Sequence, residues 1–90
     1  MLAQNSIHMF YTYILYSSTH DRFYIGQTNN LEERIIRHNK GHVKSTKSYK
    51  PWKLVHYEEF DTRAQAVSRE TELKKWKSAD KIRALIDASR

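Results

Sequence analysis

The sequence predicts one small α+β domain in which a three-stranded antiparallel sheet is flanked by helices, in the order ββαβαα. Aromatic and β-branched residues fill Met9–Ser17, Arg22–Gln27 and Trp52–Phe60, as is typical of strands. Capping residues followed by apolar residues at helical spacing indicate helices between and after these strands. Because 90 residues can bury only one modest core, we expect a single domain over residues 9–90, preceded by a flexible tail of residues 1–8.

The first half of the chain carries a hairpin signal and then a helix signal. Turn-forming residues at 18–21 join the first two strands, so these strands should pair as a hairpin. Asn29 and Asn30 can each cap a helix, and the glutamates that follow lie at its positive end. Gly41 suits the left-handed position after a helix, which should therefore end at about Lys40.

Two more helices are expected after the third strand. Thr62 and Gln65 have the spacing of a capping box, which predicts a helix that reaches about Lys77. Ser78 can cap a third, short helix. Its apolar residues recur at helical spacing: Ala79, Ile82, Leu85 and Ile86.

Composition narrows the classes of partner and chemistry. Sixteen Lys and Arg residues against ten Asp and Glu residues give a net charge of +6, which favours a polyanionic partner such as nucleic acid. The absence of cysteine excludes disulfides, thiolate metal sites and cysteine nucleophiles. We find neither a membrane-spanning run nor the apolar core of a signal peptide, so we expect a cytoplasmic protein.

The segment from Lys40 to Lys53, "KGHVKSTKSYKPWK", is the most basic part of the chain. It contains five lysines and no acidic residue, with Tyr49 and Trp52 between them. Lysines that reach successive phosphates, beside an aromatic ring that stacks on a base, are what binding to a nucleic-acid backbone requires. We therefore assign substrate binding to Lys44, Lys47, Lys50 and Tyr49, the alternative being a solvated connection.

Glu70 breaks the apolar pattern of the second predicted helix. At about 100° per residue, this carboxylate falls inside the stripe that should face the core. An inward carboxylate requires a cation, a metal ion or hydrogen-bond donors to compensate it. A glutamate at the edge of the stripe that reaches water or a lysine is the alternative. The stripe consists of Ala66, Val67, Leu73 and Trp76.

Arg34 and His38 lie one turn apart on the first predicted helix, at the border of its core-facing stripe of Leu31, Ile35 and Ile36. A guanidinium offers a fixed fork of donors that matches a phosphate. A neighbouring imidazole can take a proton or orient water. Two ordinary residues at the rim of an amphipathic helix would give the same pattern.

Tyrosines and a glycine complete the group. Tyr11 and Tyr13 share one face of the first strand, and Tyr24 opens the Tyr-Ile-Gly of the second. A phenol can donate, accept or relay a proton, although tyrosines also simply pack in sheets. Gly26 either keeps the edge of the sheet small or lets a sugar-phosphate backbone approach closely.

Over about residues 9 to 77 these motifs together resemble the GIY-YIG endonuclease superfamily, and in particular its short bacterial single-domain group, UPF0213 or YhbQ-like. Tyr24-Ile25-Gly26 matches the second motif literally, and Tyr11-Thr12-Tyr13 stands where the superfamily has Gly-Ile-Tyr. The family arginine matches Arg34, and a histidine found in many members matches His38. The metal-binding glutamate matches Glu70.

The resemblance implies an endonuclease that hydrolyses DNA phosphodiester bonds with one divalent ion, Mg²⁺ or Mn²⁺, and that acts on particular DNA structures in repair or recombination. Glu70 would hold the ion and Arg34 the phosphate, while Tyr13, Tyr24 or His38 would activate the attacking water. The partner would be DNA, in duplex, branched or single-stranded form, and the protein a monomer or weak dimer away from membranes.

Two other functions remain open from the sequence. A nucleic-acid-binding module that kept the fold without catalysis would share the basic segment but be indifferent to metal. An adaptor that docks on another protein would expose an apolar patch, for which Trp76, Leu85 and Ile86 are the candidates.

Overall fold

The computed structural model describes residues 8–89 and contains the expected three-stranded antiparallel sheet, in the order β2-β1-β3. The strands are β1 (Phe10–Ser17), β2 (Arg22–Thr28) and β3 (Lys53–Phe60). Each lies within one residue of its predicted bounds. The predicted fold class is therefore confirmed. Of the expected N-terminal tail only His8 falls among the described residues, and it is exposed.

The register of the sheet brings the two tyrosine motifs together. β1 is the central strand, and it pairs antiparallel with both neighbours. Tyr13 in β1 lies opposite Gly26 in β2 and opposite Tyr57 in β3. The hairpin turn between β1 and β2 includes Asp21 at a φ of 49°. The hairpin thus fixes the distance between the first motif and the second.

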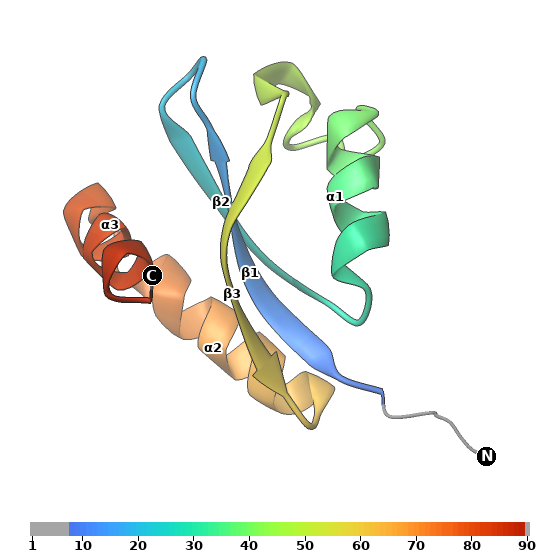
Figure 1. Cartoon of the computed structure of the whole chain (residues 1–90), viewed down its shortest axis with the longest axis vertical. Helices are drawn as coiled ribbons and strands as arrows, with labels where there is room; N and C mark the ends of the chain where they lie inside the picture. Colours follow the sequence, from blue (N-terminus) through green and yellow to red (C-terminus); the bar gives the residue numbers. More distant parts are fainter. Residues whose placement is uncertain (1–7, 90) are drawn as a thin grey trace.

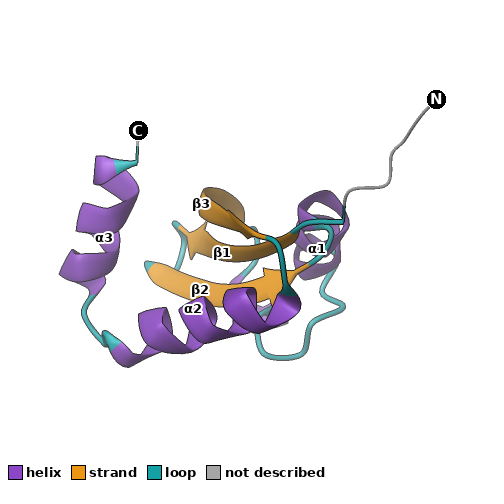
Figure 2. Cartoon of the chain, turned by 90° about the horizontal axis from the view of Figure 1, so that it is seen from below, coloured by secondary structure: helices purple, strands orange, loops and turns teal. Residues whose placement is uncertain are grey.

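Helices cover both faces of the sheet. In Figure 1, α1 (Leu31–Asn39) lies on one side of the strands, and α2 (Arg63–Lys75) and α3 (Ala79–Ala88) lie on the other. Figure 2 shows α2 running along the sheet and α3 standing at a steep angle to α2. A single 3₁₀ turn, Lys47–Tyr49, interrupts the segment that we expected to be a loop.

Local capping explains why each helix begins where it does. Asn30, Thr62 and Ser78 each accept a hydrogen bond from the backbone N–H three residues further on, at 3.1 to 3.3 Å. The Gln65 side-chain carbonyl in turn accepts a hydrogen bond from the Thr62 backbone N–H, which completes the predicted capping box. Gly41 ends α1 at a φ of +79°, the left-handed conformation that glycine adopts without strain.

The end of α2 differs from the sequence prediction. The helix stops at Lys75, two residues before the predicted Lys77. Lys77 itself has a φ of 52°, so it cannot continue a right-handed helix. Ser78 then starts α3 as expected, and the bend between the two helices lets both pack on one face of the sheet.

A separate apolar cluster lies on each face of the sheet. The cluster under α2 and α3 has as its buried members Ile14, Leu73, Ile82 and Ile86. The cluster under α1 is formed around Tyr13, Leu15 and Trp52. Successive side chains of β1 point to opposite faces of the sheet, so they pack alternately in the two clusters.

Two residues that we assigned to the core are exposed. Ile36 in α1 is 48 % exposed and Val67 in α2 is 41 % exposed. Helical spacing places each of them near the apolar stripe, but the sheet beneath is only three strands wide and does not reach that far around the helices. Ala66 and Leu73 are buried as expected.

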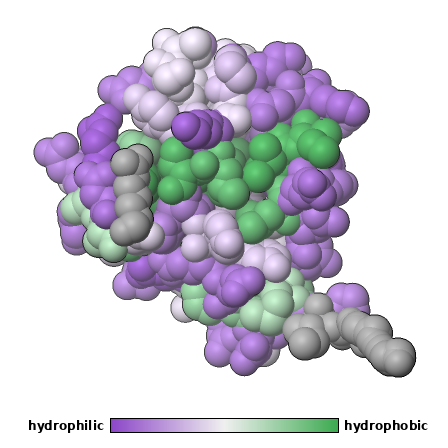
Figure 3. Space-filling model, in the orientation of Figure 1, coloured by the Kyte–Doolittle hydropathy of each residue, from purple (hydrophilic) through white to green (hydrophobic). Residues whose placement is uncertain are grey.

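The third strand forms an edge of the sheet and faces the viewer in Figure 1. Figure 3 shows apolar surface gathered across the middle of this face. Residues of β3 and α3, including Leu54, Val55 and Ile86, line a groove of about 480 Å³ here. Among residues 8–89 no helix is long and apolar enough to cross a membrane.

Candidate active site

Three of the predicted site residues meet between the sheet and α1. Tyr13 comes from β1, Tyr24 from β2 and His38 from the last turn of α1. The His38 ring lies 4.9 Å from the Tyr24 ring and 6.0 Å from the Tyr13 ring, centroid to centroid. Tyr13 Oη and His38 Nε2 are hydrogen-bonded at 3.0 Å. The second motif and the histidine are thus brought against the first motif's tyrosine.

His38 is buried, which corrects the expectation that it lies at the rim of α1. None of its surface is exposed. The segment after α1 folds back over the imidazole, and Thr46 Oγ1 lies 2.8 Å from His38 Nδ1. The ring is therefore held on both sides, by a phenol and by a hydroxyl.

The segment that covers His38 is secured by its own hydrogen bonds. The indole Nε1 of Trp52 donates to the backbone carbonyl of Thr46 at 2.9 Å. The Asn39 amide accepts from the Trp52 N–H at 2.6 Å and donates to the Trp52 carbonyl at 3.0 Å. Trp52 is buried as a result, so it cannot stack on a base as its position in the basic segment suggested.

Burial changes the acidity of both partners. Burial, followed by the nearby charges of Arg34 and Arg37, lowers the pKa of His38 to about 4, so the imidazole is neutral near pH 7. Burial is also the main reason why the pKa of Tyr13 is raised above its usual value; Tyr24 and Glu70 add to the effect, whereas Arg34 opposes it. The pair is therefore an uncharged phenol beside an uncharged imidazole.

Arg34 lies next to this pair and has an unsatisfied donor. Its Nε atom is buried and has no hydrogen-bond partner among the described residues. Its positive charge acts to lower the pKa of both Tyr13 and His38. Because a buried donor without a partner costs free energy, an anion that accepted from this guanidinium would stabilise the site.

Gly26 is needed by the protein itself. A Cβ at this position would lie 2.6 Å from Tyr13 Oη and 2.7 Å from the adjoining ring carbon. The missing side chain therefore makes room for the Tyr13 phenol, and the close approach that we considered for a sugar-phosphate backbone is made by this ring instead.

Glu70 lies on α2, and its carboxylate pairs with a lysine of the same helix. Its side chain is only 18 % exposed, and Lys74 Nζ lies 2.7 Å from its Oε2. The carboxylate is therefore compensated by a lysine, as the alternative interpretation of the sequence expected. It remains close enough for its charge to raise the pKa of Tyr13.

Any metal ion at this site would be held by one protein carboxylate, that of Glu70. Within residues 8–89 no three His, Asp or Glu side chains come together as a metal cluster. A single hard carboxylate suits Mg²⁺ or Mn²⁺, ions that keep most of their waters when one protein oxygen binds them. Oε2 of Glu70 is engaged by Lys74, which leaves Oε1 as the available ligand atom.

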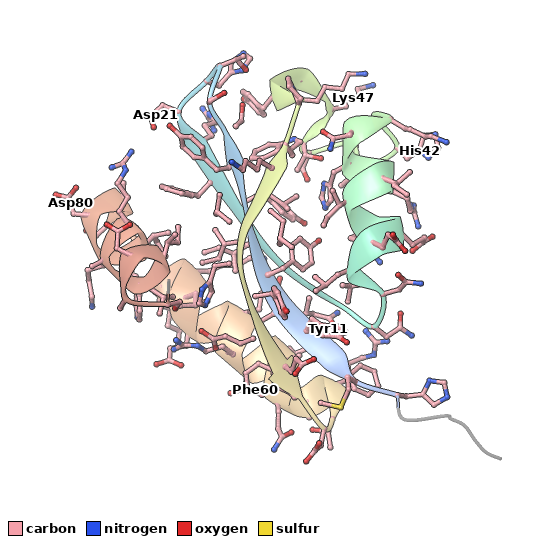
Figure 4. The ribbon with its side chains drawn as sticks, in the orientation of Figure 1. Tyr11, Asp21, His42, Lys47, Phe60 and Asp80 are labelled. Carbon is pink, nitrogen blue, oxygen red and sulfur yellow. The ribbon has the colours of Figure 1, made fainter. Side chains whose placement is uncertain are left out.

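The lysines of the basic segment are exposed, as predicted. Lys44, Lys47 and Lys50 all lie on the surface, and Figure 4 shows Lys47 extending from the end of the molecule near the close of α1. Tyr49 is only half-buried, and its ring already has two close neighbours. The Arg22 guanidinium lies 4.4 Å above it, and the His20 ring packs edge-on at 5.1 Å. A base that stacked on this ring would share it with these neighbours.

The apolar patch expected of an adaptor is largely covered. Ile86 belongs to the buried cluster, and Leu85 packs against it. The indole of Trp76 is flanked by cations, with Lys81 Nζ at 4.7 Å and the Arg69 guanidinium at 5.6 Å. Trp76 and Leu85 remain partly exposed, and the apolar surface on this side of the molecule lies along the groove between β3 and α3.

Thr46 and Asn39 are the residues of this region that the sequence pattern missed. A threonine among lysines and an asparagine at the end of a helix both read as surface residues. Asn39 has a usable signal, because it lies at the end of α1, two residues before Gly41, and can close the following loop. Thr46 has no such signal in the sequence, since its burial depends on the contact between this loop and Trp52, which only the folded chain makes.

The class of protein follows from this arrangement of two paired tyrosine motifs, an arginine one turn before a histidine, and a glutamate on the next helix. The family model of the GIY-YIG catalytic domain matches residues 9–83. This range includes all six residues of the candidate site: Tyr13, Tyr24, Gly26, Arg34, His38 and Glu70.

Relatives of similar length narrow the family. A UPF0213 protein of Natronomonas pharaonis is 38 % identical over 86 % of this chain and 91 % of its own. One from Clostridium perfringens is 40 % identical over 90 % and 87 %. The solution NMR structure of a UPF0213 protein of Bacillus halodurans is 30 % identical, covers 89 % of this chain and 84 % of its own, and gives a TM-score of 0.55. The chain belongs to the UPF0213 family of GIY-YIG domain proteins.

Proposed function

We propose that this protein is a metal-dependent endonuclease that hydrolyses DNA phosphodiester bonds. The observation that carries the proposal is the Arg34 guanidinium, whose buried Nε lacks a partner among the described residues and lies beside the hydrogen-bonded pair of Tyr13 and His38. Such a site offers a non-titrating cation for a phosphate oxygen next to groups that can orient water. The net charge of +6 and the exposed lysines favour a polyanionic substrate.

The roles of the residues follow from their chemistry. Arg34 binds a non-bridging oxygen of the scissile phosphate and offsets the charge that grows there. The cluster of Tyr13, Tyr24 and His38 orients the attacking water and takes up its proton. Glu70 would hold Mg²⁺ or Mn²⁺, which supplies positive charge at the phosphate and the leaving oxygen when bound.

Cleavage by wild-type protein and two glutamate variants tests the proposal. The substrates are labelled duplex, flap and four-way-junction DNA, with Mg²⁺, Mn²⁺ or EDTA. Glu70→Gln should lower the rate by about 100-fold or more and leave DNA affinity unchanged, because it removes the carboxylate that would hold the divalent ion. Glu72→Gln is the matched control, since Glu72 lies two residues away on α2 with its side chain 58 % exposed. It should cut like the wild type.

Each outcome has a definite meaning. Cutting that requires both metal and Glu70 supports the nuclease, and the preferred substrate reports whether DNA structure is selected. Metal-independent binding without cutting on every substrate would replace the nuclease with a binding module that has the same fold. Equal rates for Glu70→Gln and Glu72→Gln would remove Glu70 from the mechanism.

A further inference from the structure

Thr46 brings a buried hydroxyl from the basic segment against the candidate site. It is 1 % exposed although its neighbours Ser45 and Lys47 lie on the surface. Its Oγ1 lies 2.8 Å from His38 Nδ1, on the side of the imidazole opposite Tyr13. Neither the family match nor the roles proposed above assign this residue any part.

Counting donors and acceptors around Tyr13 gives the direction of its hydrogen bond. The phenol is buried, so its proton needs an acceptor. Its oxygen has hydrogen-bonding contacts with His38 Nε2, which can accept, and with the Arg34 guanidinium, which can only donate. Tyr13 therefore donates to Nε2, which must be the unprotonated ring nitrogen.

The other side of the imidazole agrees with this assignment. A neutral imidazole carries one proton, so with Nε2 unprotonated the proton is on Nδ1, which donates to Thr46 Oγ1. The Thr46 hydroxyl in turn has an acceptor in the backbone carbonyl of Val43 at 3.3 Å. The chain of hydrogen bonds then runs in one direction, from Tyr13 through His38 and Thr46 to Val43.

We propose that Thr46 is a positioning residue that holds His38 in the Nδ1–H tautomer, so that the Tyr13 phenol donates inward and presents its lone pairs to the attacking water. In the other tautomer His38 Nε2–H would donate to the phenol, whose own proton would then point into the site. Tyr13 would become a donor where an acceptor is needed. The catalytic meaning of the inference rests on the proposed function, but the tautomer itself does not.

The position of Thr46 is fixed independently of its hydroxyl. Its carbonyl accepts from the Trp52 indole, and its N–H donates to the Val43 carbonyl at 3.1 Å. Removal of the hydroxyl should therefore leave the loop in place. Thr46→Val retains the shape of the side chain, and Thr46→Ser restores a hydroxyl.

The ¹⁵N chemical shifts of the His38 ring nitrogens, measured by NMR at pH 7, test the tautomer directly. We expect the Nδ1–H form in the wild type and in Thr46→Ser, and loss of its dominance in Thr46→Val. Ser45→Ala, an exposed change one residue away, should match the wild type. An Nε2–H tautomer in the wild type overturns the inference whatever the variants do, and so does an unchanged Nδ1–H form in Thr46→Val.

A kinetic measurement separates this inference from the proposed function. If the wild type cuts DNA, Thr46→Val should lower kcat by about 10-fold or more at unchanged DNA affinity, and Thr46→Ser should recover it, because the wrong tautomer disables a histidine without moving it. Equal kcat values for wild type and Thr46→Val would overturn the catalytic part. A wild type that cuts no DNA contradicts the nuclease, while the NMR result still decides the tautomer.

Discussion

Gly26 and Tyr13 occupy each other's space, and this contact links a motif glycine to the stability of the site. A methyl group on Gly26 would lie 2.6 Å from a phenol oxygen that is itself hydrogen-bonded to His38. Tyr13 is 1 % exposed, so its ring has no open space into which it can move. The literal glycine of the second motif is thus explained by packing within the protein.

Gly26→Ala should therefore lower the free energy of unfolding by about 1 to 3 kcal/mol, the usual cost of overpacking, and disturb the ring resonances of His38. Chemical denaturation and NMR would measure the two effects. Gly41→Ala is the control. It should cost about 1 to 2 kcal/mol through its positive φ alone and leave His38 unchanged, because its nearest neighbour is the flexible Lys50 side chain. A Gly26→Ala variant as stable as the wild type would contradict the packing argument.

The depressed pKa of His38 predicts how stability depends on pH. The folded imidazole stays neutral down to about pH 4, whereas an unfolded one takes up a proton near pH 6.5. Between these values the unfolded chain binds the additional proton, so the free energy of unfolding should fall as the pH drops from about 6.5 to 4. The loss should not exceed about 3 kcal/mol.

Urea denaturation across this pH range, with wild type and His38→Gln compared, would isolate the contribution of His38. Other titrating groups act in both proteins and cancel in the difference. His42→Gln, an exposed change beyond the end of α1, should keep the wild-type slope. If His38→Gln and the wild type lose stability in parallel, the imidazole is not protected from protonation.

At the level of elements, the segment from Lys40 to Lys53 has a buried side that packs against the site and an exposed side that carries lysines. Its buried side, with Thr46 and Trp52, closes over His38. Its exposed side carries Lys44, Lys47 and Lys50. Because the buried side fixes the backbone, the lysines can be exchanged without moving the site.

Replacing Lys44, Lys47 and Lys50 together by Gln should weaken DNA binding at every sequence. The slope of log K against log salt concentration should become shallower by about 0.9 for each phosphate that the lysines no longer bind. Fluorescence anisotropy at several salt concentrations would measure it. Lys75 and Lys77 lie at the far end of α2, and their replacement by Gln should change the slope less. An identical slope in the Lys44 triple variant and the wild type would reduce the segment to a connection.

For the molecule as a whole, the sheet separates the residues that stabilise the fold from most of those that form the site. The cluster of Ile14, Leu73, Ile82 and Ile86 lies on the face covered by α2 and α3. Tyr13, Tyr24 and the covering α1 belong to the opposite face. Glu70 is the exception, since it belongs to α2 and its charge still raises the pKa of Tyr13.

Ile82→Ala should therefore destabilise the protein without altering the site. Removal of this buried side chain from α3 should lower the free energy of unfolding by about 2 to 5 kcal/mol. DNA affinity, measured at a temperature where the variant remains folded, should equal that of the wild type. Val67→Ala, at an exposed position on α2, should change stability by less than about 0.5 kcal/mol. A selective loss of affinity in Ile82→Ala would mean that the two faces are coupled.

The sequence by itself determined the order of strands and helices, the helix starts at Thr62, at Ser78 and at one of the two residues Asn29 and Asn30, and the family. These features depend on local chemistry: a capping hydroxyl or amide acts within three residues, and alternation or helical spacing is a property of one segment. The motif residues are also recognisable because their spacing along the chain is fixed by these same elements.

Only the tertiary structure decided which of these residues are buried and how they contact one another. The burial of His38, the closure of the loop by Asn39 and Trp52, and the contact of Thr46 with the imidazole each depend on a segment that returns from elsewhere in the chain. Helical spacing placed Ile36 and Val67 in the core, but a sheet of three strands is too narrow to cover them. Burial is set by the distance between elements, which no local pattern encodes.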